Sequence, residues 1–344
     1  MNKKLKVVSL FSGIGAFEKA LENLKIDYEL IAFSEIEKSA INSYCAIHNV
    51  NKNLNLGDIT KIDLDKFEGL EVDLLTHGSP CQDFSVIGRN AGGDEGSNTR
   101  SSLMWNSVEI IRKCKPKVVI WENVKNVLAE KNIHNFEKYL NNLENLGYTN
   151  HYKVLNSKNF GIPQNRERIY VVSILNNDIE FSFPEGKEYE GTIFDILETS
   201  EENIKNKYQP KERFFLNFKD KNDTKISEDV FSGKMGDKLV GDFRYDKGIR
   251  IRENGKAPTL TCRASSSFSG TPIIFEKKNG EMTARNLTEK ETFRLMGFSD
   301  EDYYKAEEAN PRRLKHINGA IYRQAGNSIV VNVLMVIFEE LYLK

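Results

Sequence analysis

A cysteine stands where a folded α/β chain can use it as a nucleophile. Cys81 follows an apolar run, Val72–Leu75, that predicts a short buried strand, and Ser79-Pro80 then fixes the turn that presents the thiol. The segment from Gln82 to Arg100 is polar and glycine-rich, and it has no helical or strand period. A loop of this length in a compact domain is usually a lid or a binding loop. The segment therefore indicates a reactive thiol under a cover, although a lone cysteine is more often a small buried hydrophobe.

A carboxylate and two guanidinium groups are expected near the same edge of the sheet. The next apolar run predicts a second buried strand that ends in Glu122, so Cys81 and Glu122 occupy equivalent carboxyl ends, where α/β sheets bind ligands. Further along, Gln164, Arg166 and Arg168 alternate with a period of two, which places them on one face if the segment is extended. A structural salt bridge between Glu122 and an arginine is an equally good explanation.

The first strand and turn are typical of a nucleotide-cofactor site. A predicted strand, Lys6–Phe11, passes through Gly13 and Gly15 into a predicted helix, and such a turn brings backbone N–H groups close to a ligand. Glu35 ends the second predicted strand 20 residues after Gly15, where it can accept hydrogen bonds from ribose hydroxyls. Asp58 can accept from an exocyclic amine. Each feature alone is weak evidence, because such turns and helix-terminal acids are common.

The composition limits the class of protein. With 344 residues, of which 39% are hydrophobic, the chain can bury a sizeable core and is expected to form two lobes. A net charge of −1 provides no global basic field, so any nucleic-acid surface must be local. The four cysteines lie far apart and no histidine cluster accompanies them, which argues against a metal site or a disulfide framework and favours the cytoplasm. The apolar segments are too short to predict secretion or a membrane span.

A local basic segment lies in the second half of the chain. Lys234–Arg263 holds eight Lys and Arg residues against four acids, an excess of four positive charges. Arg250 and Arg252 alternate with isoleucines, as on a strand with one basic face, and a Ser-rich loop follows. Such segments are normally solvated surface, but basic strands with polar loops also suit phosphate and base-edge contacts.

The C-terminal part predicts two further helices. Thr288 and Glu291 have the spacing of a capping box that opens one helix. Gly326-Asn-Ser328 is expected to cap a last helix, Ile329–Tyr342, which is apolar on most sides. Such a helix must be buried, and we expect it beside the first strand and helix of the sheet.

In order along the chain, six blocks resemble the motifs of the bacterial DNA (cytosine-5) methyltransferases. They are Phe11-Ser-Gly-Ile-Gly15, Pro80-Cys81-Gln82, Glu122-Asn-Val124, Gln164-Asn-Arg-Glu-Arg168, Arg285-x-Leu287 to Arg294-Leu-Met-Gly-Phe298, and Gly326-Asn-Ser328. The resemblance covers nearly the whole chain except about Asp178 to Asn279, which corresponds to the family's variable target-recognition region.

The resemblance implies an α/β protein: a Rossmann-like S-adenosylmethionine-dependent methyltransferase sheet with a smaller, mostly β target-recognition domain. The expected parts are residues 1–180 (catalytic, S-adenosylmethionine-binding), 181–285 (target recognition), 286–325 (hinge and return segment) and 326–344 (a C-terminal helix that completes the catalytic domain).

The resemblance also assigns site residues. The catalytic set is Cys81, Glu122, Arg166 and Arg168. The set expected to bind S-adenosyl-L-methionine is Phe11, Gly13, Ile14, Gly15, Glu35, Ile36, Asp58, Ile59, Pro80, Leu103, Asn327 and Ser328. The set expected to bind DNA is Gln82, Ser85, Arg89, Gln164, Arg244, Arg250, Arg252, Thr259, Arg263 and Ser265. Ile36 stands where the family often has an aromatic residue against adenine, so this wall of the pocket is aliphatic.

The implied chemistry explains these residue types. Cytosine C5 is a poor nucleophile, and addition of the Cys81 thiolate at C6 creates an enamine whose C5 can attack a methyl sulfonium. Protonated Glu122 is placed to hydrogen-bond or protonate N3, while Arg168 holds O2 and Arg166 supports the loop or the thiolate. A stacked base cannot enter such a pocket, so the cytosine must flip out of double-stranded DNA.

We therefore predict a sequence-specific DNA cytosine-5 methyltransferase that acts as a cytoplasmic monomer. It would be an orphan or phage methylase, or the partner of a restriction endonuclease that acts on the same site. A tRNA cytosine-5 methyltransferase of the same fold is the main alternative, and the basic insertion favours duplex DNA over it. A nicotinamide dehydrogenase would leave Cys81 and the arginines unexplained, and a catalytically inactive DNA-binding regulator would not need them.

Overall fold

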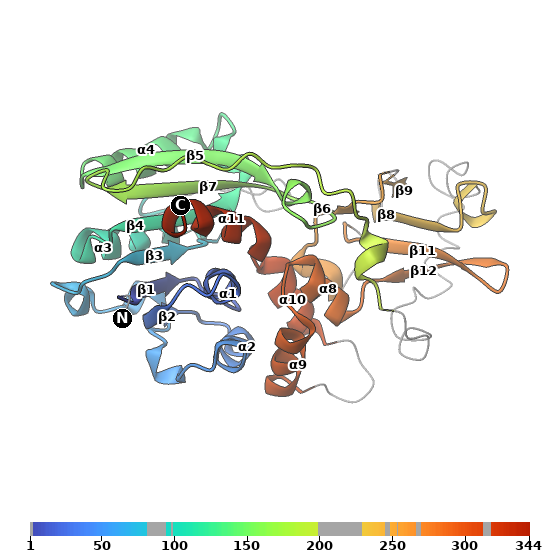
Figure 1. The fold of residues 1–344 in the computed structure, drawn as a ribbon, viewed down its shortest axis with the longest axis horizontal. Coiled ribbons are helices and arrows are strands. Elements are labelled where there is room, and N and C mark those ends of the chain that lie inside the picture. Colours follow the sequence, from blue (N-terminus) through green and yellow to red (C-terminus); the bar gives the residue numbers. More distant parts are fainter. Residues whose placement is uncertain are drawn as a thin grey trace. The chain divides into compact units, whose positions relative to one another are not determined.

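The computed structural model describes residues 3–80, 94–97, 99–198, 229–244, 248–252, 254–265, 270–311 and 318–344, without the side chains of 264 and 265. The chain divides into two compact units (Figure 1). The first unit comprises Met1–Asn156, Glu167–Gly186 and Val331–Lys344, and the second comprises Ser157–Arg166 and Lys187–Val330. Each unit is described separately.

The first unit is built on a six-stranded sheet in the order β2-β1-β3-β4-β7-β5. Its strands are β1 (Leu5–Leu10), β2 (Tyr28–Ser34), β3 (Leu74–His77), β4 (Val118–Val124), β5 (Tyr148–Asn156) and β7 (Glu167–Leu175). Strand β1 pairs in parallel with β2 and β3, and β3 with β4, whereas β7 is antiparallel to β4 and β5. This mainly parallel sheet confirms the predicted α/β class.

One strand begins later than predicted, because β3 starts at Leu74 rather than Val72. Strand β4 continues through Glu122 to Val124, and the sequence predicted that this strand ends in that block. The continuation has a physical reason, because Glu122 pairs with Tyr170 and Val124 with Arg168 on β7. A neighbouring strand that returns antiparallel thus extends β4 beyond its apolar run.

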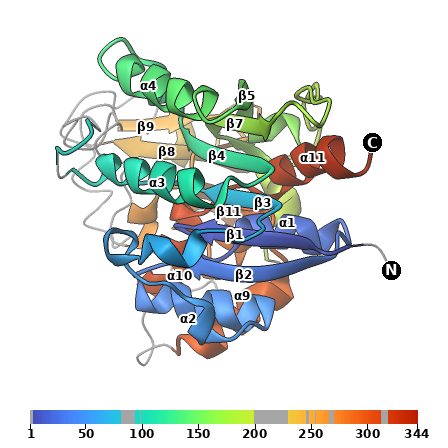
Figure 2. The same ribbon diagram turned by 90° about the vertical axis from the view of Figure 1, so that its left-hand side faces the viewer.

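Helices cover both faces of this sheet. They are α1 (Ala16–Asn23), α2 (Lys38–His48), α3 (Met104–Cys114), α4 (Ile133–Glu144) and α11 (Val331–Tyr342). Figure 2 shows α3 and α4 on one side of the strands and α1 and α11 on the other. Leu10, Leu75 and Trp121 belong to the core cluster under α3 and α4. The rings of Phe17 and Phe338 meet edge to face at 6.5 Å, which joins α1 to α11 and confirms the burial expected for the last helix.

The second unit contains a four-stranded antiparallel sheet in the order β12-β11-β8-β9. Its elements are β6 (Gln164–Asn165), β8 (Lys238–Arg244), β9 (Gly248–Ile251), β10 (Ala257–Pro258), β11 (Ile273–Lys278), β12 (Glu281–Asn286), α8 (Glu289–Leu295), α9 (Asp300–Ala309) and α10 (Gly319–Asn327). Phe243, Ile273 and Phe275 form part of its core. Thr288 and Glu291 make both contacts of the predicted capping box at the start of α8.

The segment Gly326–Ser328 ends one helix rather than opening the next. Asn327 is the last residue of α10, and the N–H of Ser328 donates to the carbonyl of Ala325, whereas α11 begins only at Val331. A Cβ added at Gly326 would lie 2.4 Å from the backbone N of Cys262, so glycine permits this close approach of two chain segments.

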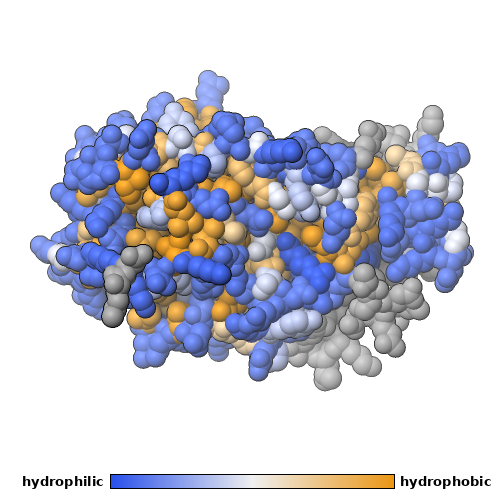
Figure 3. Space-filling model, in the orientation of Figure 1, coloured by the Kyte–Doolittle hydropathy of each residue, from blue (hydrophilic) through white to orange (hydrophobic). Residues whose placement is uncertain are grey.

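The face drawn in Figure 3 is largely hydrophilic, and hydrophobic residues appear as patches between hydrophilic ones. The stretch Gly319–Tyr342 has the length and composition of a membrane span, but 56% of its most apolar window is buried inside the protein. This burial fits core helices, and the break between α10 and α11 divides the stretch.

Candidate active site

Two of the predicted catalytic residues meet directly in the first unit. Nε of Arg168, on β7, lies 3.2 Å from Oε1 of Glu122, on β4. Glu122 is 8% exposed, and Nη1 of Arg168 also donates to the carbonyl of Glu167 at 2.8 Å. The salt bridge that the sequence left open is therefore formed.

The turn that leads to Cys81 is fixed to the residues on either side of Glu122. Nε1 of Trp121 donates to Oγ of Ser79 at 3.0 Å, and Nδ2 of Asn123 donates to the carbonyl of Ser79 at 3.2 Å. All three residues are buried. No local pattern in the sequence predicts this contact, although Asn123 belongs to the Glu122-Asn-Val124 block.

Several predicted site residues lie outside the described residues. They are Cys81 itself and the expected DNA contacts Gln82, Ser85 and Arg89. Pro80, the residue before Cys81, is described and is half-buried.

Glu35 and the glycine turn form one hydrogen-bonded unit. Oε2 of Glu35 accepts from the N–H of Gly13 at 3.0 Å, and Oε1 accepts from the N–H groups of Ile36 and Glu37, each at 2.8 Å. Burial raises the pKa of Glu35 and outweighs the opposing effect of these three donors. The carboxyl end of β2 is thus held beside the turn that follows β1.

The residues around this turn fit S-adenosylmethionine. Gly13 has φ +56° and nothing within 4 Å of where a Cβ would be, which leaves an open cradle beside its main chain. Ile36 is 74% exposed, the highest value among the described large hydrophobic residues, so an apolar wall stands next to Glu35. A carboxylate, an open glycine turn and an exposed aliphatic side chain suit a ribose and an adenine ring.

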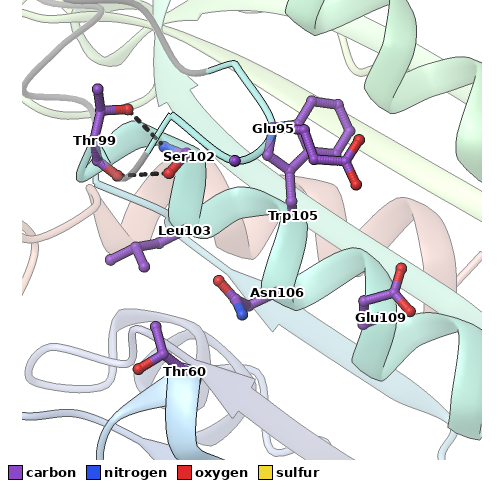
Figure 4. Close-up of a pocket in the computed structure, with 9 residues that line it drawn as sticks. Thr60, Glu95, Thr99, Ser102, Leu103, Trp105, Asn106 and Glu109 are labelled. Atoms are coloured by element: carbon purple, nitrogen blue, oxygen red, sulfur yellow. Dashed lines mark hydrogen bonds between the residues drawn. The ribbon is translucent and has the colours of Figure 1, made fainter.

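The other predicted cofactor residues differ in their surroundings. Oδ1 of Asp58 accepts from the N–H and the hydroxyl of Thr60, whereas Ile59 is buried in the core cluster. Leu103 and Thr60 line a pocket of about 520 Å³ in the first unit, where Figure 4 shows them with Asn106. Phe11 has φ +52°, and Ile14 is buried. In the second unit Asn327 is exposed and Ser328 is buried.

Gln164 and Arg166 are buried in the second unit and bind main-chain carbonyls. Arg166 donates from Nη1 to Leu260 and from Nη2 to Ser328, both at 2.8 Å. Gln164 donates to the carbonyl of Leu295 at 3.0 Å and accepts from the N–H of Leu260 at 2.9 Å. Gln164 is 0% exposed, which argues against its predicted contact with DNA. The period-two alternation does appear in their burial.

The predicted basic strand is organised by Asp242, one of the four acids in the basic segment. Asp242, 2% exposed on β8, pairs with Nη2 of Arg250 and, at 3.0 Å, with Nη2 of Arg252. Asp242 and Arg250 are register partners across β8 and β9. Cross-strand pairing could have predicted this contact, but only if the register of β8 and β9 had been known.

The remaining expected DNA contacts also lie in the second unit. Arg244 and Arg263 are exposed, and the hydroxyl of Thr259 donates to the carbonyl of Asn165 at 2.7 Å. Ser265 lies in a 3-10 turn, Cys262–Ser265. No group of three or more His, Cys, Asp or Glu side chains could hold a metal ion in the part of the chain that the structure describes.

Comparisons with known proteins agree with this geometry. A family model for C-5 cytosine-specific DNA methylases matches residues 5–343. The type II methyltransferase M2.ScrFI of Lactococcus lactis subsp. cremoris is 33% identical, over 98% of this chain and 99% of that protein. The orphan methyltransferase M.SPRI of Bacillus phage SPR is 31% identical, over 98% and 97%. The crystal structure of S. pombe Dnmt2 methyltransferase shares the fold, with a TM-score of 0.68 at 21% identity over 98% and 97%.

Proposed function

The chain belongs to the family of C-5 cytosine-specific DNA methylases, and we propose that Glu122, Arg168 and the anchored Ser79 turn arrange its chemistry around one flipped cytosine. The protein is a DNA cytosine-5 methyltransferase that uses S-adenosylmethionine, which supplies an electrophilic methyl group when bound. DNA is favoured over tRNA because the matching family acts on DNA.

The observation that carries the proposal is the Glu122–Arg168 pair beside the turn that leads to Cys81. The Cys81 sulfur forms a bond to cytosine C6 while N3 gains a proton from Glu122, which makes C5 nucleophilic. C5 then bonds to the methyl carbon as the bond from that carbon to the sulfonium sulfur breaks, and S-adenosylhomocysteine leaves. Loss of the C5 proton to solvent, return of the N3 proton to Glu122 and cleavage of the S–C6 bond restore the aromatic base and the thiolate.

Arg168 has a specific part in this scheme. Glu122 becomes a carboxylate once it has given its proton to N3, and the Arg168 guanidinium lies 3.2 Å from it. Arg168 therefore stabilises the carboxylate that remains after the proton has moved. Once a bound base excludes water, this attraction grows, because the local dielectric constant falls.

The cofactor is assigned to the residues that fit it. Gly13 and Gly15 bring main-chain groups close, Glu35 accepts hydrogen bonds from the ribose, and Ile36 packs on adenine. The contributions of Phe11, Asp58, Leu103 and Asn327 follow from the family motifs.

The DNA is recognised through a duplex site of defined sequence, with Arg250 and Arg252 as the leading candidates for base contacts. We propose that the enzyme works as a monomer in the cytoplasm. It would act as an orphan methyltransferase or beside a restriction endonuclease of the same specificity, as the names of its relatives suggest for those proteins.

The deciding experiment is replacement of the nucleophile. Cys81→Ser should abolish transfer of a tritiated methyl group to plasmid DNA and leave binding of S-adenosylhomocysteine nearly unchanged. Wild-type protein should label DNA and not tRNA, and bisulfite sequencing of DNA from an expressing host should reveal the site. Full turnover by the serine variant would refute the assignment of Cys81.

A further inference from the structure

A buried histidine contacts the main chain of the turn proposed to bind S-adenosylmethionine. His48 is the last residue of α2, and its side chain is 0% exposed. Its Nδ1 lies 2.7 Å from Oε1 of Glu22, and its Nε2 lies 3.0 Å from the carbonyl oxygen of Ile14. Ile14 is the middle residue of the Gly13–Gly15 turn.

These two contacts fix the number of protons on the ring. A carbonyl oxygen and a carboxylate both accept hydrogen bonds, so each ring nitrogen must donate, and only the doubly protonated imidazolium has two donors. Glu22 is itself the ionised partner, because its carboxylate also accepts from the hydroxyl of Tyr28 at 3.1 Å and pairs with Lys19 at 3.6 Å. The side chain of His48 is therefore a buried cation.

The remaining groups around the ring agree with this charge. Burial alone would lower the pKa of His48, but the hydrogen bond and charge of Glu22 and the charge of Glu18 raise it overall. Glu18 is 0% exposed, and burial raises its pKa although the charge of His48 opposes this. Burial also raises the pKa of Tyr44. Of the two carboxyl groups near the ring, Glu22 is the one that contacts it directly.

The ring is also packed tightly against the turn. Gly15 has φ +79°, and a Cβ added there would lie 2.1 Å from Nε2 of His48 and 2.9 Å from the ring of Tyr44. His48 thus contacts the carbonyl of Ile14, while Glu35 accepts from the N–H of Gly13. Two residues of the turn are therefore fixed by hydrogen bonds to ionisable side chains.

We propose that His48 is a positioning residue for S-adenosylmethionine, which holds the Gly13–Gly15 turn in its binding conformation only while its ring carries two protons. The inference rests on the proposed cofactor site and adds a pH dependence to it. When the ring loses a proton, one nitrogen lone pair faces an acceptor oxygen, either that of Ile14 or that of Glu22, and repels it. The turn then relaxes, so cofactor affinity falls as pH rises.

The test measures binding of S-adenosylhomocysteine by calorimetry over a pH series. Wild-type affinity should be flat at neutral pH and fall at alkaline pH. In Glu22→Gln the fall should begin at lower pH, because the carboxylate that retains the proton is gone. His48→Gln should bind S-adenosylhomocysteine about 10-fold more weakly at neutral pH, as expected for loss of a charge-assisted hydrogen bond. Its affinity should no longer decrease at alkaline pH. His151→Gln, on β5, is the matched control and should behave as wild type.

Histidine NMR gives a readout that is independent of binding. At pH 7 both ring nitrogens of His48 should have imidazolium chemical shifts, assigned by their loss in His48→Gln. His77 is the internal contrast, because burial lowers its pKa to about 3 and it should remain neutral. Glu22→Gln keeps the ring in place, so the inference stays testable if His48→Gln fails to fold.

Each outcome has a distinct meaning. A neutral His48 ring at pH 7, or an affinity that does not change with pH in the wild type, would overturn the inference and leave the cofactor site standing. Absence of any S-adenosylhomocysteine binding at every pH would instead overturn the proposed site itself.

Discussion

Oε1 of Glu122 lies 3.2 Å from Nε of Arg168, across the paired strands β4 and β7. This contact joins the group proposed to protonate cytosine N3 to the group proposed to hold O2. It arises because β4 continues past its apolar run and pairs with β7 through Val124. The sheet, rather than a flexible loop, therefore sets the distance between the two groups.

Glu122→Gln should lower methyl transfer by about 10²- to 10³-fold, because the amide keeps the size of the side chain but cannot give its proton to N3. Binding of S-adenosylhomocysteine should not change. Tritium transfer to plasmid DNA measures the effect. Glu167→Gln is the control, since Glu167 neighbours Arg168 but is exposed and pairs with Lys125. Nearly full activity of Glu122→Gln would show that Glu122 does not protonate N3.

Asn123→Ala should destabilise the protein by about 1–3 kcal/mol, because the buried carbonyl of Ser79 loses its donor. Trp121→Phe removes only the indole N–H that donates to the Ser79 hydroxyl and should cost less, about 1 kcal/mol. Urea unfolding measures both. An Asn123→Ala protein as stable as wild type would show that the Ser79 turn does not depend on this anchor.

The sequence was sufficient where the signal is local. An apolar run predicted the strand that leads to Cys81, and short-range spacing predicted the acid that ends β2 and the capping box at Thr288, because each depends on residues a few positions apart. Whether Glu122 pairs with an arginine could not be decided, since that depends on which strand lies beside β4. The resemblance to the family assigned the roles of the catalytic residues, and the fold showed which side chains they contact.

Two of the contacts that sequence reasoning missed join distant segments. His48 and Ile14 are 34 residues apart, and Asn123 and Ser79 are 44 apart. No periodicity links such pairs, so they become visible only when the register and the packing of helices are known. Gln164 shows the opposite error, in which a polar residue in a motif was assigned to DNA although it is buried against main-chain groups.

Arg166→Lys should destabilise the protein by about 1.5–3 kcal/mol, the range for a lost hydrogen bond to a charged group. A single ammonium cannot reproduce the forked contacts with the carbonyls of Leu260 and Ser328. Urea unfolding monitored by circular dichroism measures the change. Arg112→Lys is the matched control, because Arg112 is exposed and its ion pair with Glu109 is at the surface. Equal stability of both variants would contradict the structural role of Arg166.

Asp242→Asn should relax sequence specificity without weakening cofactor binding. The buried aspartate orients Arg250 and Arg252, and a neutral amide would release both guanidinium groups. Discrimination against wrong sites should fall by about 10- to 100-fold, equivalent to the 1–3 kcal/mol of one bidentate base contact. Bisulfite sequencing of a methylated plasmid library measures it. Glu276→Gln, on β11, is the control; an unchanged sequence profile in Asp242→Asn would exclude the arginine pair from recognition.

Asp73 gives a pH-dependent prediction for the strand that carries the Cys81 turn. Its Oδ2 accepts from the N–H of Lys6 at 3.0 Å and its Oδ1 pairs with Lys117 at 2.7 Å. Burial raises the pKa of Asp73, but these partners outweigh it and lower the pKa overall. A lowered folded-state pKa means that the stabilisation is present above the unfolded-state pKa and is lost as pH falls through the folded-state value.

Asp73→Asn should therefore cost about 1–2 kcal/mol at pH 7, where the carboxylate is fully ionised, and the difference from wild type should shrink below about pH 4. Asparagine can still accept from the N–H of Lys6, so the loss isolates the contact with Lys117 and the charge. Urea midpoints of both proteins at neutral and acid pH measure it. A destabilisation of the same size at both pH values would mean that the side chain acts through packing, since a contribution from ionisation must disappear once both proteins carry a neutral residue 73.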